Sequence, residues 1–321
     1  MNPPPPPPPS ALNLCLAAFA SAGVAGLLYL ASHAPNLWVL VGAAVAFSFL
    51  NNTLFSLLHE AVHGVFAKNQ RLNDWGGRYL AAFFPTGFGF QRVCHLGHHQ
   101  RNRSRAEQFD YIRPGDSRLL KYAQWYGLLT GFFWLLGPIT CLLYLCLPFV
   151  LELTLLRGDN KIAQQAGADA MLSGFRNANP VVLRLELLGT IALQAGLWWL
   201  LDLSLLGWAA CYGAFALNWS ALQYADHAWS PLDAKEGAWN LRVSPLVRGL
   251  FLNYHHHLAH HQHPKVPWLY LADYVDFEAE RPSFLGVYAR MWLGPKPFPA
   301  ELLAAELNAE GEREAAGAAS S

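Results

Sequence analysis

The sequence predicts an all-α, polytopic membrane protein with about four transmembrane helices and a re-entrant or interfacial hairpin. Two observations support this fold class. Of the 321 residues, 53% are hydrophobic and only 14% are charged, whereas an ordinary soluble domain carries about 25% charged residues. Four apolar segments are also long enough to cross a bilayer as helices. The formal net charge is zero, which gives no reason to expect nucleic acid as a partner.

The two ends of the chain differ in composition from the rest. Residues 1–10 include seven consecutive prolines, which favour polyproline II without internal hydrogen bonds, so we expect a disordered arm. Residues 302–321 are rich in Ala, Glu and Gly, and we expect a low-complexity tail. The apolar run Ala11–Ala31 is too long for the core of a signal peptide and is better interpreted as a transmembrane anchor. The five cysteines show no CxxC spacing, so neither a disulfide framework nor a thiolate metal site is expected.

The apolar segments set the expected order of helices along the chain. The four predicted spans are Ala11–Ala31, Leu37–Leu58, Val181–Leu201 and Leu203–Leu222. A fifth apolar region, Tyr126–Leu156, is interrupted by Gly137-Pro138 and by Pro148. It is too long for one upright span, and two full spans would need roughly 40 residues. A short re-entrant or interfacial hairpin, with proline marking its turn or kink, fits this region best.

The positions of the basic residues predict the orientation. All 22 Lys and Arg residues lie beyond residue 67, and the two short turns, at His33–Asn36 and around Asp202, contain none. By the positive-inside rule, the long segments between the hairpins face the cytoplasm. We therefore expect an integral membrane protein, of a bacterial inner membrane, with its helical cap on the cytoplasmic side.

Three histidine clusters fall in these predicted cytoplasmic segments. The first is His59-Glu60-Ala61-Val62-His63, whose i, i+4 spacing places both imidazoles on one face of a helix. The second, His95-Leu96-Gly97-His98-His99, and the third, His257-Leu258-Ala259-His260-His261, share the pattern HxxHH. His227 follows the fourth predicted span. Imidazole binds iron, zinc and copper, and nine imidazoles are too many for one ion and suit two, so the cap is expected to hold a metal site.

The three clusters resemble the histidine boxes of the membrane fatty acid desaturase superfamily, which read HxxxH, HxxHH and HxxHH. The stretch Asn253-Tyr254-His255-His256-His257-Leu258-Ala259-His260-His261-Gln262-His263-Pro264 is also similar to the family's third box and its flanks. The resemblance runs from about residue 35 to 270, within a membrane desaturase-like domain over residues 11–301. It implies the following metal ligands: His59, His63, His95, His98, His99, His227, His257, His260 and His261.

The resemblance also implies a reaction and its requirements. Two iron ions, with O2 as co-substrate, would oxidise the hydrocarbon chain of a lipid or fatty acid, and a fatty acyl desaturase is the favoured activity. Possible supporting residues beside the ligands are Glu60, Gln223, Asp226, Asn253 and His255. Gln223 stands where acyl-CoA desaturases carry an Asn. The sequence contains no dinucleotide fingerprint, fused haem motif or iron–sulfur cysteine set. Electrons are therefore expected from a separate ferredoxin, b5-type cytochrome or flavoprotein reductase.

Alternative interpretations remain open at this stage. A hydroxylase, a carotenoid ketolase and an oxidative decarboxylase that forms a terminal alkene would use nearly the same boxes. A different class is the intramembrane zinc metalloprotease, because His59 to His63 is a literal HExxH with Glu60 as general base. That class leaves both HxxHH boxes unexplained. A metal transporter would instead need histidines along a path across the bilayer.

The segment around the second box also contains candidate substrate contacts. Its aromatic and glycine residues are expected to line an apolar tunnel for the hydrocarbon chain or to form an interfacial belt: Trp75, Phe83, Phe84, Gly87, Phe88, Gly89 and Phe90. Arg92, Arg101 and Arg103 are candidates to bind a carboxylate or phosphate group, although the positive-inside bias explains them equally well.

Overall fold

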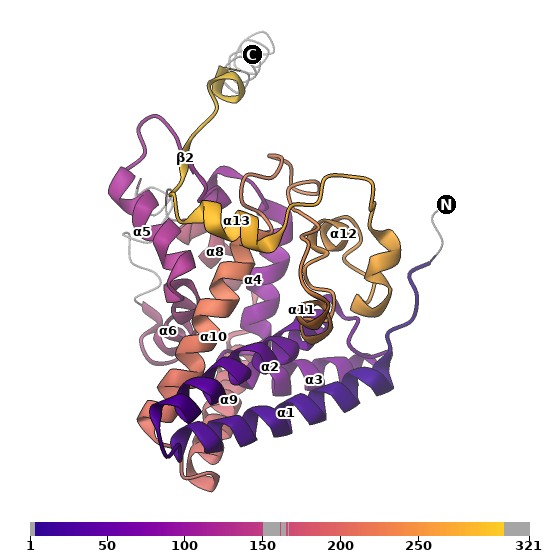
Figure 1. Cartoon of the computed structure of the whole chain (residues 1–321), viewed down its shortest axis with the longest axis vertical. Coiled ribbons are helices and arrows are strands. Elements are labelled where there is room, and N and C mark those ends of the chain that lie inside the picture. The colour runs from indigo at the N-terminus through magenta and orange to yellow at the C-terminus, as the bar shows by residue number, and fades with distance from the viewer. Residues whose placement is uncertain (1–3, 150–160, 162–164, 166, 305–321) are drawn as a thin grey trace.

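The computed structural model describes residues 4–149, 161, 165 and 167–304, and these residues are mostly helical (Figure 1). In chain order the elements are α1 (Ser10–Ser32), α2 (Leu37–His63), α3 (Gln70–Ala82), α4 (Phe88–Arg101), η1 (Arg105–Glu107), β1 (Tyr111–Ile112), α5 (Arg118–Leu129), α6 (Phe132–Cys146), α8 (Ala168–Ser173), η4 (Gly174–Asn177), α9 (Pro180–Leu200), α10 (Leu205–Ala225), α11 (Pro245–Leu250), α12 (His257–Gln262), η5 (Trp268–Tyr274), α13 (Phe284–Met291) and β2 (Lys296–Pro297). The two short strands pair in parallel.

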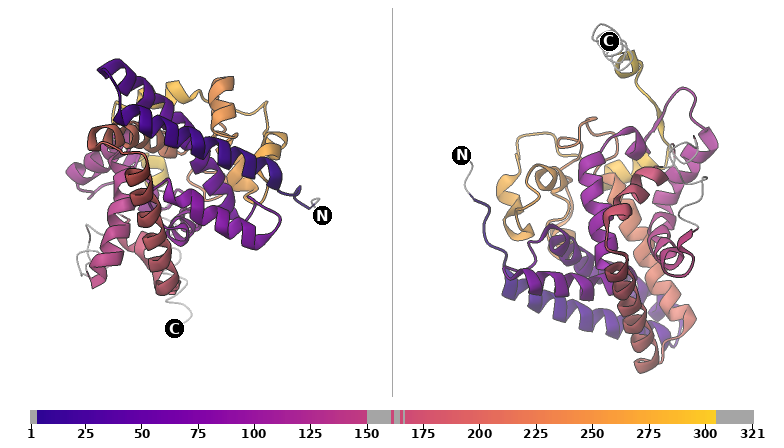
Figure 2. Two further views of the ribbon diagram at one scale, coloured as in Figure 1. Left: turned by 90° about the horizontal axis from the view of Figure 1, so that it is seen from below. Right: turned by 180° about the vertical axis from the view of Figure 1, so that it is seen from behind.

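Two helical hairpins, α1–α2 and α9–α10, form the framework. Asn36 begins α2 by accepting a hydrogen bond from Val39 N, and Ser204 begins α10 by accepting one from Gly207 N. The two hairpin turns lie at the same end of the molecule, because His33 Nε2 is 3.8 Å from Asp202 Oδ2. Helix α10 packs against both α1 and α2, and the view from below shows α1 and α2 side by side (Figure 2).

Among the described residues, three helices are long and apolar enough to span a membrane: α1, α2 and α9. They confirm three of the four predicted spans. Helix α2 continues five residues beyond the predicted end at Leu58, so that the first histidine box lies on its last turns. The fourth predicted span forms as α10, but this helix is not among the three that meet the length and apolarity criterion. Many α10 residues are buried among the other helices, so its role as a span stays a prediction.

The predicted hairpin at Tyr126–Leu156 corresponds in part to α5 and α6. These helices are bent by 96° to one another and together have the composition of one broken span or a re-entrant loop. The 96° bend does not lie at a proline, because Pro138 is inside α6 and Pro148 follows the end of that helix. The chain breaks instead at Gly131, whose φ of +82° favours glycine. The part of the hairpin from residue 150 onward lies outside the described residues.

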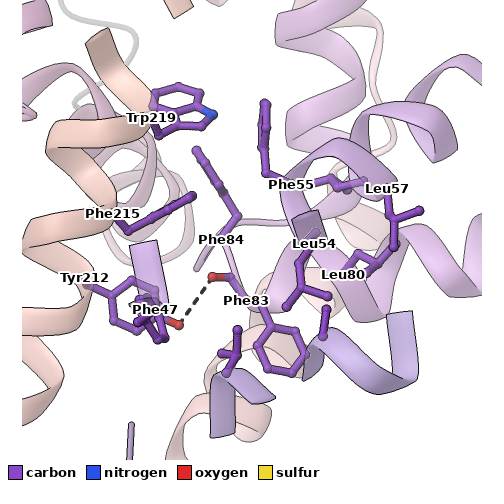
Figure 3. Close-up of a cluster of buried hydrophobic side chains, with 14 of the residues drawn as sticks. Phe47, Leu54, Phe55, Leu57, Leu80, Phe83, Phe84, Tyr212, Phe215 and Trp219 are labelled. Carbon is purple, nitrogen blue, oxygen red and sulfur yellow. Dashed lines mark hydrogen bonds between the residues drawn. The ribbon is translucent and has the colours of Figure 1, made fainter. Parts of the chain in front are cut away.

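A layer of buried aromatic and aliphatic side chains packs α2, α10 and the α3–α4 connection together (Figure 3). Phe84 contacts Phe55 and Trp219 with ring centroids 5.2 Å and 4.8 Å apart. In the same layer, the Tyr212 hydroxyl donates to the Phe83 carbonyl at 3.3 Å. This apolar layer supports the end of α2 that carries His59 and His63.

The segments from residue 245 to 291 cover the other side of that helix end. In Figures 1 and 2, the orange segments of this region lie beside the start of α1. Trp268 joins them, since its Nε1 donates to Asn13 Oδ1 at 2.9 Å. The expected domain boundaries at residues 10 and 302 stay predictions, because residues 1–3 and 305–321 lie outside the described part of the chain. Residues 4–9 precede α1 without forming a helix.

Candidate metal centre

The structure gathers all nine predicted ligand histidines into two groups, in each of which the candidate ligand atoms lie within 4.8 Å of one another. We call them group A and group B. Group A consists of His59, His63, His95, His99 and His260, and group B consists of His98, His227, His257 and His261. Helices α4 and α12 each contribute to both groups, which therefore adjoin. The rings of His99 and His261, one from each group, are stacked 4.3 Å apart.

Group A has ring nitrogens that face one another at short range. His95 Nε2 lies 2.8 Å from His63 Nε2 and 3.1 Å from His99 Nε2. His99 Nε2 lies 3.0 Å from His260 Nε2. The fifth ring, His59, is buried, and its Nε2 has no hydrogen-bond partner. Several convergent nitrogens cannot all be paired by the few protons of neutral rings, so a cation at their centre would satisfy them.

The hydrogen bonds of group B indicate which ring nitrogens are free to bind a metal ion. His98 Nδ1 is 2.6 Å from Glu107 Oε2, and His227 Nδ1 is 2.8 Å from the Gly237 carbonyl oxygen. When both rings are neutral, these acceptors place the protons on Nδ1. The two Nε2 lone pairs then face each other across 3.2 Å. A metal ion between the Nε2 atoms would remove this repulsion, so the donor set fits a bound cation.

Burial lowers the pKa of several candidate ligand rings outside the membrane-spanning helices and so favours the neutral form, which binds a metal: His95, His99, His227, His257, His260 and His261. Burial, followed by the nearby His98 and His59, lowers the pKa of His99 to about 2. Burial is also the main reason why the pKa of His227 is well below its ordinary value. Nitrogen ligands without thiolates suit iron, zinc or copper, and the geometry alone does not select among them.

Asp226 is the predicted supporting residue whose carboxyl approaches two rings of group B. Its side chain is fully buried, with Oδ2 3.5 Å from His257 Nδ1 and Oδ1 3.8 Å from His227 Nε2. Neither oxygen has a hydrogen-bond partner in the described part of the chain, and burial raises the pKa of this carboxyl well above its usual range. A buried, unpartnered carboxyl is costly, and cations bound by the adjacent imidazoles would compensate a negative charge there.

Gln223 reaches the histidines through a tyrosine. Its Oε1 accepts a hydrogen bond from the Tyr254 hydroxyl at 3.0 Å, while its Nε2 is buried without a partner. The Tyr254 ring packs against His59 and His257, with centroids 5.0 Å and 5.2 Å away. Tyr254 therefore contacts one ring of each group, and this role was not foreseen from the sequence.

The other predicted supporting residues have different partners. Glu60 Oε2 accepts a hydrogen bond from Trp268 N at 3.0 Å, and Asn253 Nδ2 donates to the Trp268 carbonyl at 3.0 Å. Both side chains thus hold the start of η5 and make no described hydrogen bond to an imidazole. His255 belongs to neither histidine group, and its ring packs on His256 with centroids 4.0 Å apart.

Glu107 is a second supporting residue, besides Tyr254, that sequence reasoning missed. It follows the second box by eight residues, outside any fixed motif, and reaches His98 only because η1 turns back toward α4. Its other oxygen lies 3.3 Å from Arg101 Nε. An acidic residue soon after a histidine box was the only available signal, and such residues are too common to select one.

A buried ion pair fixes the chain on either side of this centre. Arg103 donates to both carboxylate oxygens of Asp110, at 2.9 Å and 2.8 Å, and their side chains are 1% and 0% exposed. The same carboxylate accepts Trp229 N, and Arg103 also donates to the Ser230 carbonyl. The pair therefore anchors the turn that follows His227.

The arginines predicted as anion ligands already have protein partners. Arg103 is buried, so the expectation that it binds a surface carboxylate or phosphate is wrong. Arg92 is paired with Asp74 at 3.0 Å. Of the predicted tunnel wall, Phe83, Phe84, Phe88 and Phe90 are buried, whereas Trp75 is exposed. The two glycines predicted for the same wall, Gly87 and Gly89, pack near Glu186, whose Oε2 accepts the N–H of Gly89.

The fold and the two histidine groups define a helical membrane protein with a candidate site for two metal ions. A family model for fatty acid desaturases matches residues 35–292, and the chain belongs to the fatty acid desaturase family. Comparison with curated proteins gives no match. Family membership implies an oxidoreductase, which agrees with the resemblance seen in the histidine boxes.

Proposed function

We propose that this protein is a di-iron oxidase of lipid hydrocarbon chains, most simply an O2-dependent fatty acyl desaturase. The observation that carries the proposal is the sorting of nine histidines into two adjoining groups, together with membership of the desaturase family. A zinc protease would use His59 and His63 with Glu60 as base. Here Glu60 accepts a hydrogen bond from Trp268 N, and the two groups contain seven further histidines. We therefore do not favour a zinc protease.

The nine histidines would hold two iron ions, five ligands around one and four around the other. The chemistry that bound iron supplies is oxidation of unactivated C–H bonds: O2, two electrons and two protons take two hydrogens from adjacent carbons and leave a double bond and two waters. The protein's own part is to fix the ring orientations. Glu107 and the Gly237 carbonyl hold the Nδ1 protons of His98 and His227, which directs each Nε2 lone pair inward.

A hydrocarbon substrate is supported by an apolar cleft among the helices. A cleft of about 380 Å³ lies between α6 and α9, lined mainly by apolar side chains such as Leu142, Ile191 and Trp198. The aromatic layer of Phe84 and Phe55 leads from that region to Tyr254, which packs on His59. We propose that the acyl chain occupies the cleft, where packing sets which carbon is oxidised.

The cleft can be tested apart from the metal centre. Ile191→Trp would fill the cleft, and we expect less product, or product oxidised at a different carbon, with unchanged iron content. The control is Leu188→Trp on the same helix, at an exposed position that does not line the cleft. If both variants behave like the unaltered protein, the substrate does not use this cleft.

We further propose that the metal centre faces the cytoplasm. The two hairpin turns without basic residues meet at one end of the molecule, and the histidines lie at the opposite end of α2. The positive-inside rule then places the histidines with the basic segments. On that side a separate ferredoxin, b5-type cytochrome or flavoprotein reductase would supply the electrons.

The deciding experiment is expression in a bacterial host with a ferredoxin system, followed by mass spectrometry of total lipids and volatile hydrocarbons. A new double bond supports the desaturase, while a hydroxyl, a ketone or a terminal alkene would assign one of the related activities. His260→Ala should abolish the product. His33→Ala is the matched control, because His33 lies in the distant α1–α2 turn and contacts Tyr29. An unchanged lipid profile in all three strains, or one zinc and no iron in the purified protein, would refute the proposal.

A further inference from the structure

A group of basic side chains lies beside the third histidine box but outside both histidine groups. We call it the arginine site; it consists of Arg242, Arg248, Arg281, His255 and His256. Backbone hydrogen bonds bring its segments together. Leu241 N donates to the His255 carbonyl at 2.9 Å, and Arg242 N donates to the Pro282 carbonyl at 2.9 Å. Asn253 N donates to the Arg248 carbonyl at 3.1 Å.

The positive charges of the arginine site have no negative partner among the described residues. None of its three arginines forms an ion pair there, and the Nε of Arg281 is buried without a hydrogen-bond partner. The Nδ1 atoms of His255 and His256 are also unpartnered, and each residue is 2% exposed.

Acidic residues precede Arg281 in the same loop, but they do not neutralise the arginine site. Asp276, Glu278 and Glu280 are exposed, and none of them makes an ion pair with the three arginines among the described residues. The charges of Arg242, Arg248 and Arg281 thus remain available for an anion. Guanidinium groups are suited to a phosphate, because one group can donate two N–H bonds to its oxygens.

The surroundings of the arginine site are apolar and exposed. Leu246, Phe277 and Leu285 flank it with 71%, 57% and 74% of their surface exposed. Cations beside exposed leucine and phenylalanine are typical of surfaces that lie at the boundary between lipid headgroups and acyl chains. A site for a soluble phosphate compound would not require these exposed apolar side chains.

The position of α11 along α2 also places the arginine site at the membrane. Thr53 Oγ1 donates to the Leu250 carbonyl at 2.6 Å, and Ser56 Oγ donates to the Phe251 carbonyl at 3.0 Å. Thr53 lies ten residues before His63, at which α2 ends, or about 15 Å along the helix axis. Arg248 on α11 is therefore held beside a membrane-spanning helix, within its histidine-bearing half.

We propose that the arginine site binds the phosphate group of an anionic membrane lipid. Arg248 and Arg281 would contact the phosphate, and Leu246, Phe277 and Leu285 would lie against the acyl chains. The proposal is independent of the oxidase function, because it concerns a bound lipid whether or not that lipid is oxidised.

Lipid retention by the purified protein tests this proposal. The detergent-solubilised full chain is mixed with dioleoylphosphatidylglycerol or dioleoylphosphatidylcholine and analysed by native mass spectrometry. We expect the unaltered protein to retain one phosphatidylglycerol and little phosphatidylcholine. The double variant Arg248→Gln, Arg281→Gln should retain phosphatidylglycerol about 30-fold less tightly, at roughly a factor of five per arginine.

The control removes a different exposed arginine near the same surface. Arg290→Gln, at the end of α13, should leave retention unchanged; Arg290 Nε is bonded to the Gly286 carbonyl. Circular dichroism identifies variants that fail to fold, and the single variant Arg248→Gln, at an exposed position, then replaces the double one. Equal retention of both lipids, an equal loss in Arg290→Gln, or displacement of the lipid by inorganic phosphate at equal concentration would overturn the proposal.

Discussion

The buried ion pair between Arg103 and Asp110 gives the sharpest stability prediction. Asp110→Asn keeps the shape of the side chain but leaves the Arg103 guanidinium, 1% exposed, without its counter-charge. Breaking a fully buried pair by removing one partner costs about 3–5 kcal/mol. The matched change Asp74→Asn breaks the Arg92–Asp74 pair, whose side chains are 34% and 29% exposed, and should cost at most about 1 kcal/mol.

Reversible unfolding in mixed micelles, followed by circular dichroism, measures both free-energy changes. Asp110→Asn should also lower iron retention, because Asp110 holds the turn after His227 through Trp229 N. The double variant Arg103→Met, Asp110→Asn should lose less stability than the sum of its two single variants, because no stranded charge remains. If Asp110→Asn lowers the unfolding free energy no more than Asp74→Asn does, the Arg103–Asp110 pair does not stabilise the fold as argued.

Three further outcomes are expected. Asp226→Asn should weaken iron binding about 10–100-fold in competition with a chelator, while the iron-free protein unfolds no more easily; tighter iron binding would contradict this role. His227→Ala should reduce iron from about two ions per chain to about one by elemental analysis, and unchanged iron would remove His227 from the ligand set. Gly131→Ala should cost about 1–3 kcal/mol of unfolding free energy, because its Cβ would lie 2.9 Å from the α10 backbone at a φ of +82°. The control is Gly189→Ala, where the added Cβ would meet open space. Equal losses of unfolding free energy in the two variants would refute the argument.

The charges around the candidate metal centre have opposite consequences for folding and for metal binding. Asp226 is buried without a partner, and the Nε2 atoms of His98 and His227 face each other. Each arrangement is unfavourable in the empty fold and favourable around a cation. Other interactions must therefore stabilise this arrangement of side chains in the metal-free protein. The Arg103–Asp110 pair and the aromatic layer under α2 supply that support.

Local sequence patterns predict the helical membrane architecture and the nine candidate ligand histidines. Apolar runs of spanning length predict α1, α2 and α9 because a backbone in lipid must satisfy its hydrogen bonds within the helix. The i, i+4 spacing of His59 and His63 requires only a helix to bring both rings to one face. These features depend on local periodicity, and local periodicity can be read without knowing any distant contact.

The division of those histidines into two groups depends on how the helices pack. His98 and His99 are neighbours in the chain, yet they belong to different groups, as do His260 and His261. Successive residues on a helix point about 100° apart, so their partners depend on which other helices pack on each side. Glu107 at His98 and the break at Gly131 depend likewise on chain segments that meet only after folding, through contacts that no local pattern encodes.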